Sequence, residues 1–192
     1  METICQKQMI EQKRNLPNGY EYANSNNHNN CVTSDTQIII VGTITPPAGN
    51  GYFYTAPRNR IYGYIDVARR TDLKGLKTKL VGSNAPTDII NEIKGTLINE
   101  HIAFLDIFES VIRKSNSPYD SDIKYATLDY NTFKKTLNTL QAKTIKIICN
   151  SRLAESGFKS ILKGMKPTCN IKTIIYLSQR CGKKANWITA LK

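Results

Sequence analysis

The chain has 192 residues, of which 40% are hydrophobic and 22% are charged, as is typical of one globular domain with a substantial core. No apolar run approaches the roughly 20 residues that a membrane-spanning helix needs, and residues 1–15 lack the apolar segment of a secretory signal. The net charge is +12, from 27 Lys and Arg against 15 Asp and Glu. This excess favours a polyanionic partner, most often nucleic acid; an anionic membrane surface or simple solubility are the alternatives.

The five cysteines are dispersed along the chain and form no Cys-x-x-Cys pair. An odd, scattered set predicts reduced thiols in a cytoplasmic protein, not a disulfide framework or a zinc site. We therefore expect no metal and no cofactor. Buried thiols are commoner than catalytic ones, and no His–Cys pairing accompanies Cys149 or Cys181, so neither is expected to be a nucleophile.

Residues 1–35 are predicted to be an N-terminal extension. It begins with a short helix, turns at residues 17–19, and continues into an Asn-rich tract over residues 24–30 that we interpret as a flexible loop because it is polar and aperiodic. Residues 36–192 form the predicted domain.

Four short Ile-rich segments predict parallel strands that are buried on both faces. They are Gln37–Gly42, Ile102–Ile107, Thr144–Cys149 and Thr173–Leu177. Helical patterns lie between them: one capped by Thr87, one around Phe133 and Leu137, and one capped by Ser151 that Gly164 and Pro167 end. This alternation predicts an α/β fold, a three-layer α/β/α sandwich with a central four-stranded parallel sheet.

The segment after the first strand, over residues 43–60, has an unusual composition for a simple connection. It carries Pro and Gly residues, the aromatic run Tyr52-Phe53-Tyr54 and the triplet Arg58-Asn59-Arg60. Aromatic rings can stack on a flat base and arginines can bind phosphates, whereas an amide such as Asn59 both donates and accepts hydrogen bonds. The alternative is that the aromatic residues form a local hydrophobic cluster.

The order of several motifs resembles the uracil-DNA glycosylase superfamily, and is most similar to its hypoxanthine-DNA glycosylase-like and mismatch-specific branches. The first motif is VGT…P…GYFYTAPRNRIYGYI, followed by EHIAFLDI over 100–107, RKS over 113–115 and DSDI over 120–123. A strand ending in Asn150 and a C-terminal loop over 177–187 complete the likeness, which extends from about residue 36 to the end of the chain.

This resemblance implies that a nucleotide is flipped out of DNA and that its N-glycosidic bond is hydrolysed. Phe53, with Tyr52 or Tyr54, would be the stacking platform, and Asn150 would read the base edge. Asn59 would polarise the attacking water or, as an almost equal alternative, only brace its loop.

Two departures from the family pattern affect the expected chemistry. Thr43 and Thr45 stand where most uracil-excising relatives have Asp or Asn, so these hydroxyls could position a water but are poor bases. The C-terminal loop lacks the usual prolines and His and has gained positive charge. We expect it to bind DNA through Ser178, Arg180, Lys183, Lys184 and Asn186, with Arg58 and Arg60 as further phosphate contacts.

The predicted function is therefore a monofunctional DNA glycosylase for a damaged, deaminated or otherwise modified base, acting as a monomer on duplex or single-stranded DNA. The base could be uracil, hypoxanthine or a hypermodified base. A catalytically weak relative that only binds DNA or a modified base is the first alternative. An unrelated α/β nucleotide-binding protein is the second.

Overall fold

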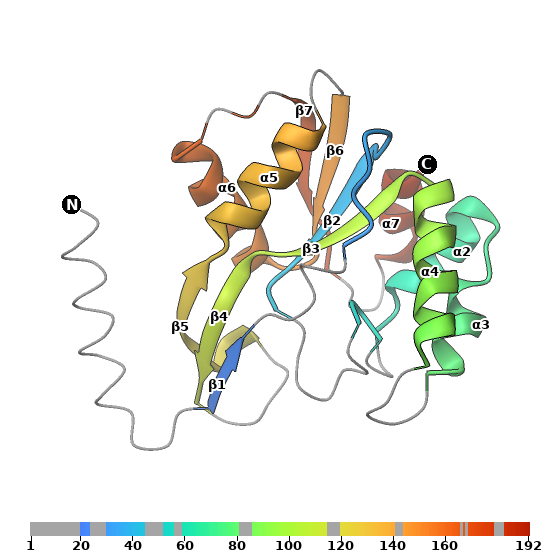
Figure 1. The fold of residues 1–192 in the computed structure, drawn as a ribbon, viewed down its shortest axis with the longest axis horizontal. Coiled ribbons are helices and arrows are strands. Elements are labelled where there is room, and N and C mark those ends of the chain that lie inside the picture. The colour runs from blue at the N-terminus through green and yellow to red at the C-terminus, as the bar shows by residue number, and fades with distance from the viewer. Residues whose placement is uncertain are drawn as a thin grey trace.

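The computed structural model describes residues 20–23, 30–44, 52–55, 59–80, 86–114, 120–140, 144–165, 167, 169–178 and 183–192. The predicted N-terminal helix and nearly all of the Asn-rich tract lie outside these residues. The two layers of helices and the sheet between them are visible in Figure 1.

The central sheet has the predicted four parallel strands. They are β2 (Ile38–Gly42), β3 (Ile102–Asp106), β6 (Thr144–Cys149) and β7 (Asn170–Tyr176). Their order across the sheet is β3-β2-β6-β7, and each neighbouring pair is parallel. The α/β fold with a central four-stranded parallel sheet is thus confirmed.

The Ile-rich strands are explained by burial on both faces of the sheet. In β2, Ile38 and Ile40 pack into one hydrophobic cluster, whereas Ile39 and Val41 pack into the other. Side chains of a strand alternate between the two faces, so a strand covered on both sides has no position for a polar residue. All five residues of β2 are buried accordingly.

Helices cover both faces of this sheet (Figure 1). Apolar residues of α5 and α6 pack into one cluster, and those of α2, α3, α4 and α7 pack into the other. The first pair spans Tyr130–Thr139 and Arg152–Lys163; the second group spans Ile61–Arg69, Leu73–Thr78, Thr87–Asn99 and Lys184–Leu191. Helices α2 and α3 were not predicted, although their buried residues follow a helical spacing: Ile61, Tyr62, Tyr64 and Ile65 in α2, and Leu73 and Leu76 in α3.

The starts of α5 and α6 follow simple capping chemistry, and one predicted cap is wrong. The Ser151 hydroxyl accepts a hydrogen bond from the Ala154 amide at 3.1 Å, which confirms the predicted cap of α6. Asp129 caps α5 in the same way through the amide of Thr132. Helix α4, however, begins at Thr87 itself, with Pro86 at the cap position and no side-chain cap.

A second, antiparallel sheet was not predicted. It contains β1 (Tyr20–Ala23), β4 (Phe108–Arg113) and β5 (Ile123–Leu128) in the order β1-β4-β5. Strand β4 follows β3 with only Ile107 between them, so the chain passes directly from one sheet to the other. Between β4 and β5 lies the short 3₁₀ helix η2 (Asp120–Asp122), whose position beside the central sheet matters for the site.

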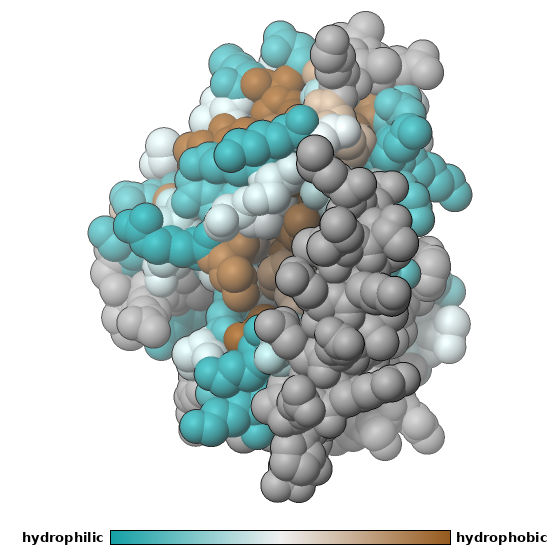
Figure 2. All heavy atoms as spheres, turned by 90° about the vertical axis from the view of Figure 1, so that its left-hand side faces the viewer, coloured by the Kyte–Doolittle hydropathy of each residue, from teal (hydrophilic) through white to brown (hydrophobic). Residues whose placement is uncertain are grey.

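The surface on the side of α5 and α6 is mixed in character, with hydrophilic residues around a smaller apolar area (Figure 2). Within the described part of the chain, the large apolar side chains that are clearly exposed are Val67, Ile98 and Tyr130. None of the helices described is both long and apolar enough to cross a membrane.

Candidate active site

The carboxyl ends of the parallel strands meet at one edge of the central sheet. Strand β3, the next parallel strand along the chain after β2, lies on one side of β2, whereas β6 and β7 lie on its other side. The ladder continues past the strand ends, since the Asn150 amide donates to the Val41 carbonyl at 3.0 Å and the Leu177 amide donates to the Cys149 carbonyl at 2.9 Å. Ligands of open α/β sheets bind where the strand order reverses in this way.

A cavity of about 450 Å³ lies at this edge. One part of its wall is Asp120 of η2; the other parts are the residues after β6 (Asn150, Ser151, Arg152 and Leu153) and the end of β7 (Tyr176 and Ser178). A volume of this size falls within the range of small-ligand sites in proteins. The cavity therefore combines a carboxylate, an amide, a guanidinium group and an aromatic ring.

Asn150 follows directly after the buried strand β6, which holds its side chain at the cavity wall. Its Oδ1 atom is buried and has no hydrogen-bond partner among the described residues. An unpaired buried acceptor costs about 1–3 kcal/mol. Such a cost is understandable where a ligand supplies the missing donor; a base-reading role for Asn150 stays a prediction.

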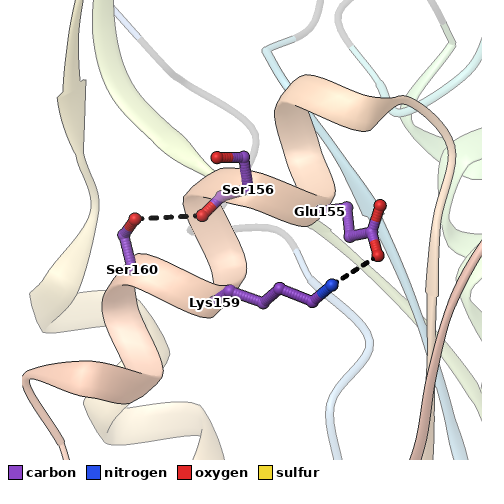
Figure 3. A network of polar contacts seen from close by, with 4 residues as sticks. All are labelled: Glu155, Ser156, Lys159 and Ser160. Atoms are coloured by element: carbon purple, nitrogen blue, oxygen red, sulfur yellow. Dashed lines mark hydrogen bonds and ion pairs between the residues drawn. The ribbon is translucent and has the colours of Figure 1, made fainter.

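The first turn of α6 forms the adjoining wall. The Arg152 guanidinium lies 5.2 Å from the centre of the Tyr176 ring, a cation–π arrangement. The N-terminus of a helix also carries a partial positive charge. Further along α6, the Lys159 ammonium pairs with the Glu155 carboxylate at 2.7 Å on the exposed face (Figure 3). Arg152 and the helix N-terminus therefore bring positive charge to the cavity wall, while the Glu155 carboxylate of the same turn is neutralised by Lys159.

Asp120 is a site residue that sequence reasoning missed. Its Oδ1 accepts a hydrogen bond from the Thr43 hydroxyl at 2.7 Å, across 77 residues of sequence. Thr43 was expected to replace the usual acidic or amide residue of the first motif, and the structure brings a carboxylate to it from η2. The sequence signal was the DSDI motif, which served only as a family marker.

Tyr54 lies behind the cavity, next to Gly42. A side chain at Gly42 would meet Asp106 Oδ1 at 2.5 Å and Tyr54 Oη at 2.8 Å, so the close approach of these groups requires glycine. Tyr54 has a φ of 57°, a left-handed conformation that is unusual for an aromatic residue. Its hydroxyl is buried without a hydrogen-bond partner among the described residues. Burial, with the nearby Asp106 carboxylate, raises the pKa of Tyr54 well above its ordinary value, so the phenol stays protonated.

The other two aromatic residues of this segment lie in the hydrophobic core. Tyr52 and Phe53 are 1% and 0% exposed. Phe53 packs against Phe104 with ring centres 5.9 Å apart, and the Tyr52 hydroxyl lies 3.0 Å from the sulfur of Cys31. Their burial favours the alternative of a local hydrophobic cluster, and a stacking role for them stays a prediction. Tyr176, which sequence reasoning did not select, is the aromatic residue of the cavity wall.

Asn59 is placed as a loop-bracing amide. Its Oδ1 accepts from the amide of Ile61 at 3.0 Å at the start of α2, and its carbonyl accepts from the Lys77 ammonium at 2.7 Å. It is not among the cavity residues, so a catalytic role for Asn59 stays a prediction. Arg60 beside it is exposed. Thr45 and Arg58 lie outside the described residues.

The C-terminal segment brings exposed basic residues near the end of β7. Ser178 lines the cavity, and its carbonyl accepts a hydrogen bond from the Trp187 indole at 2.9 Å, which ties α7 to the strand end. Lys183, Lys184 and Asn186 are exposed in and before the first turn of α7. Arg180 lies outside the described residues. DNA binding by this group stays a prediction.

The cysteines described by the structure are free and buried: Cys31, Cys149 and Cys169. Burial raises the pKa of Cys149 to about 12, with a further contribution from the Glu155 carboxylate. A thiol with this pKa is neutral at physiological pH and is a poor nucleophile. Across the described residues, no group of three His, Cys, Asp or Glu is placed to hold a metal ion.

Comparisons with known proteins support the fold. No family model matches the chain, and no curated protein matches it. A solution structure from Methanosarcina acetivorans that carries the provisional name uracil DNA glycosylase is similar, with a TM-score of 0.57 and 17% sequence identity. The match covers 84% of this chain and 92% of that one. The chain therefore has a uracil-DNA-glycosylase-like fold.

Proposed function

We propose that this protein is a DNA glycosylase that flips out a damaged, deaminated or otherwise modified base and hydrolyses its N-glycosidic bond. The observation that carries the proposal is Asn150. Its buried Oδ1 has no partner within the described part of the chain and lies at the wall of a cavity at the strand-order reversal, in a fold like that of a provisional uracil DNA glycosylase. An amide in this position can accept from and donate to the edge of a flipped base.

The charge of the molecule supports DNA as the partner. The chain carries a net charge of +12, and Arg152 at the cavity and Lys183 and Lys184 at the start of α7 are exposed. Neutralisation of phosphates by such residues releases counterions, so DNA affinity should fall steeply as salt is added. Salt-independent binding would favour the unrelated nucleotide-binding protein.

The direct test is to incubate the purified protein with duplexes and single strands that carry uracil, hypoxanthine or a hypermodified cytosine. Alkali then converts abasic sites into strand breaks. We expect breaks with at least one of these bases. Asn150→Ala should lower the rate by about 100-fold, as when one transition-state hydrogen bond is lost. Asn138→Ala, an exposed amide on α5, is the matched control and should leave the rate unchanged.

A second candidate function is binding of DNA or a modified base without catalysis. It is favoured by Thr43, which the resemblance places where an acidic or amide residue is usual. DNA retention that depends on Asn150 but produces no breaks on any substrate would support this alternative. Asn59→Ala separates the two roles considered for Asn59, because loss of activity at unchanged stability would indicate catalysis and a lowered stability would indicate bracing of α2.

A further inference from the structure

We infer that Asp120 is the carboxylate that activates the attacking water, an inference that rests on the proposed glycosylase function. Asp120 lines the cavity together with Asn150, although the two residues come from different elements. It reaches this place because η2 follows β4, the strand that leaves the central sheet at Ile107. The carboxylate is thus supplied by the second sheet and not by the segment after β2.

The hydrogen bond from Thr43 orients this carboxylate. Thr43 is 7% exposed and follows β2 directly, so its hydroxyl has a defined position. It donates to Asp120 Oδ1 at 2.7 Å, the length of a strong charge-assisted bond. An ionised carboxylate has about four acceptor sites, so one occupied site leaves capacity to accept the proton of a water. Thr43 in this view is a positioning residue.

Other carboxylates near the site are less suited to this role. Asp106 is 2% exposed and lies behind Gly42, and it is not a residue of the cavity wall. Glu155 is not a residue of the cavity wall, and its carboxylate is paired with Lys159 (Figure 3). Among the described residues, Asp120 is the carboxylate that a ligand in the cavity can contact.

The charges of the cavity wall match the charge separation of the reaction. Breaking an N-glycosidic bond develops positive charge on the sugar and negative charge on the departing base. Asp120 is negative, whereas the Arg152 guanidinium and the N-terminus of α6 bring positive charge, and the Glu155 carboxylate in the first turn is paired with Lys159. A substrate with its sugar toward Asp120 and its base toward Asn150 and α6 would be stabilised at both ends as the bond breaks.

The step is then balanced as follows. The water oxygen forms a bond to the sugar C1′ while the C1′–N bond breaks, and the bonding electron pair leaves with the base. One water proton passes to the Asp120 carboxylate. The departing base accepts a hydrogen bond from the Asn150 amide and takes a proton from solvent, and Asp120 releases its proton to solvent. The products are the free base and an abasic sugar.

The test measures single-turnover excision on the base that the wild-type protein removes. Asp120→Asn keeps the side-chain shape and should lower the rate by at least about 100-fold, while affinity for DNA with a tetrahydrofuran abasic analogue changes by less than about threefold. Asp122→Asn, the same change in the same 3₁₀ helix but away from the cavity wall, is the control and should keep the wild-type rate.

Two further measurements distinguish catalysis from a structural role. Formate should restore part of the rate of Asp120→Ala, whereas chloride at equal ionic strength should not. The wild-type rate should also fall at acidic pH, with the fall absent in Asp120→Asn. Other titratable or charged groups near this region are Asp106, Arg152, Tyr54, Cys149, Glu155 and Tyr176; the pKa of Tyr54 and of Cys149 is raised, so neither of these two groups ionises in that range.

The outcomes are distinct. A wild-type rate in Asp120→Asn, or an Asp120→Ala variant that formate does not restore, overturns the role of Asp120 and leaves the glycosylase function intact. A wild-type protein that excises none of the bases tested overturns both. Should Asp120→Asn fail to fold by circular dichroism, formate rescue of Asp120→Ala and the rate of Asp120→Glu decide the question, because Glu retains a carboxylate and should keep the acidic limb.

Discussion

The aromatic segment Tyr52–Thr55 and the cavity wall at Asn150–Leu153 both follow strands that end at the same edge of the sheet. They differ in the burial of their side chains and in whether their polar atoms have hydrogen-bond partners. Tyr52 and Phe53 are almost fully buried among core rings, whereas Asn150, beside an open cavity, has a buried oxygen with no partner among the residues that the structure describes. The difference teaches that a concentration of aromatic residues marked the core, whereas the proposed site is based on this amide and on a carboxylate from another element.

The core role of the aromatic segment is tested most strongly at Phe53. Phe53→Ala should lower the free energy of unfolding by about 3–5 kcal/mol, since it removes a fully buried ring. Urea denaturation followed by circular dichroism measures the change. The control is Tyr130→Ala, where the ring is 43% exposed and the effect should stay within about 0.5 kcal/mol. A small effect at Phe53 would mean that its ring is available to a ligand after all.

Cys149 lies at the end of β6, between the two regions, and predicts an alkaline loss of stability. Its pKa is about 12 in the folded chain against an ordinary value of 9.0, so the unfolded chain loses the thiol proton first. The stability that the protonated Cys149 thiol contributes is present below pH 9 and is lost as pH rises toward 12. Between pH 8 and pH 10, the free energy of unfolding should fall by about 1 kcal/mol for this reason.

Urea denaturation at several pH values checks this prediction. Cys149→Ala should show a shallower fall above pH 9 than the wild type, although buried tyrosines with raised pKa values leave a part of the fall in both. Cys169→Ala is the control and should retain most of the wild-type slope. Equal slopes in Cys149→Ala and the wild type would contradict the prediction.

Tyr54 belongs to the aromatic segment by sequence. Its hydroxyl, however, resembles the Asn150 oxygen, because it is buried without a hydrogen-bond partner among the described residues. Tyr54→Phe removes only that hydroxyl. Stability should stay equal or rise by up to about 1 kcal/mol, since an unsatisfied buried group is lost. If Tyr54 supports the reaction, the excision rate should fall at the same time. A lower stability without a change in rate would place Tyr54 with the core residues.

The smallest expected effect is at the ion pair of α6, whose Glu155 carboxylate lies in the first turn of the helix. Glu155→Ala removes the i,i+4 ion pair with Lys159 (Figure 3) and should cost about 0.3–0.5 kcal/mol, reduced further by salt. Thermal unfolding at low and high salt measures it. A cost above about 1 kcal/mol would show that Glu155 does more than pair on the surface.

The strands of the central sheet could be predicted because each is a short apolar run whose burial on both faces leaves no room for polar residues. The predicted N-cap Ser151 also followed from local chemistry, as did the position of Asn150 at the end of β6. Thr87 failed as a cap because the helix includes it. The second sheet was missed because the predicted strand ends at Ile107, and β4, which follows it, carries Glu109 and Ser110 and so lacks a continuous apolar run.

Sequence alone determined the central sheet, the three-layer arrangement with part of its helices, the positive charge and the amide at the end of β6. These depend on local periodicity and on side chains next to one another in the chain. Only the tertiary structure decided that Tyr52 and Phe53 pack in the core, that Tyr176 and Arg152 share the cavity wall, and that Asp120 meets Thr43. Those contacts join elements that are distant in sequence, and the packing of two sheets and a helix against one edge brings them together.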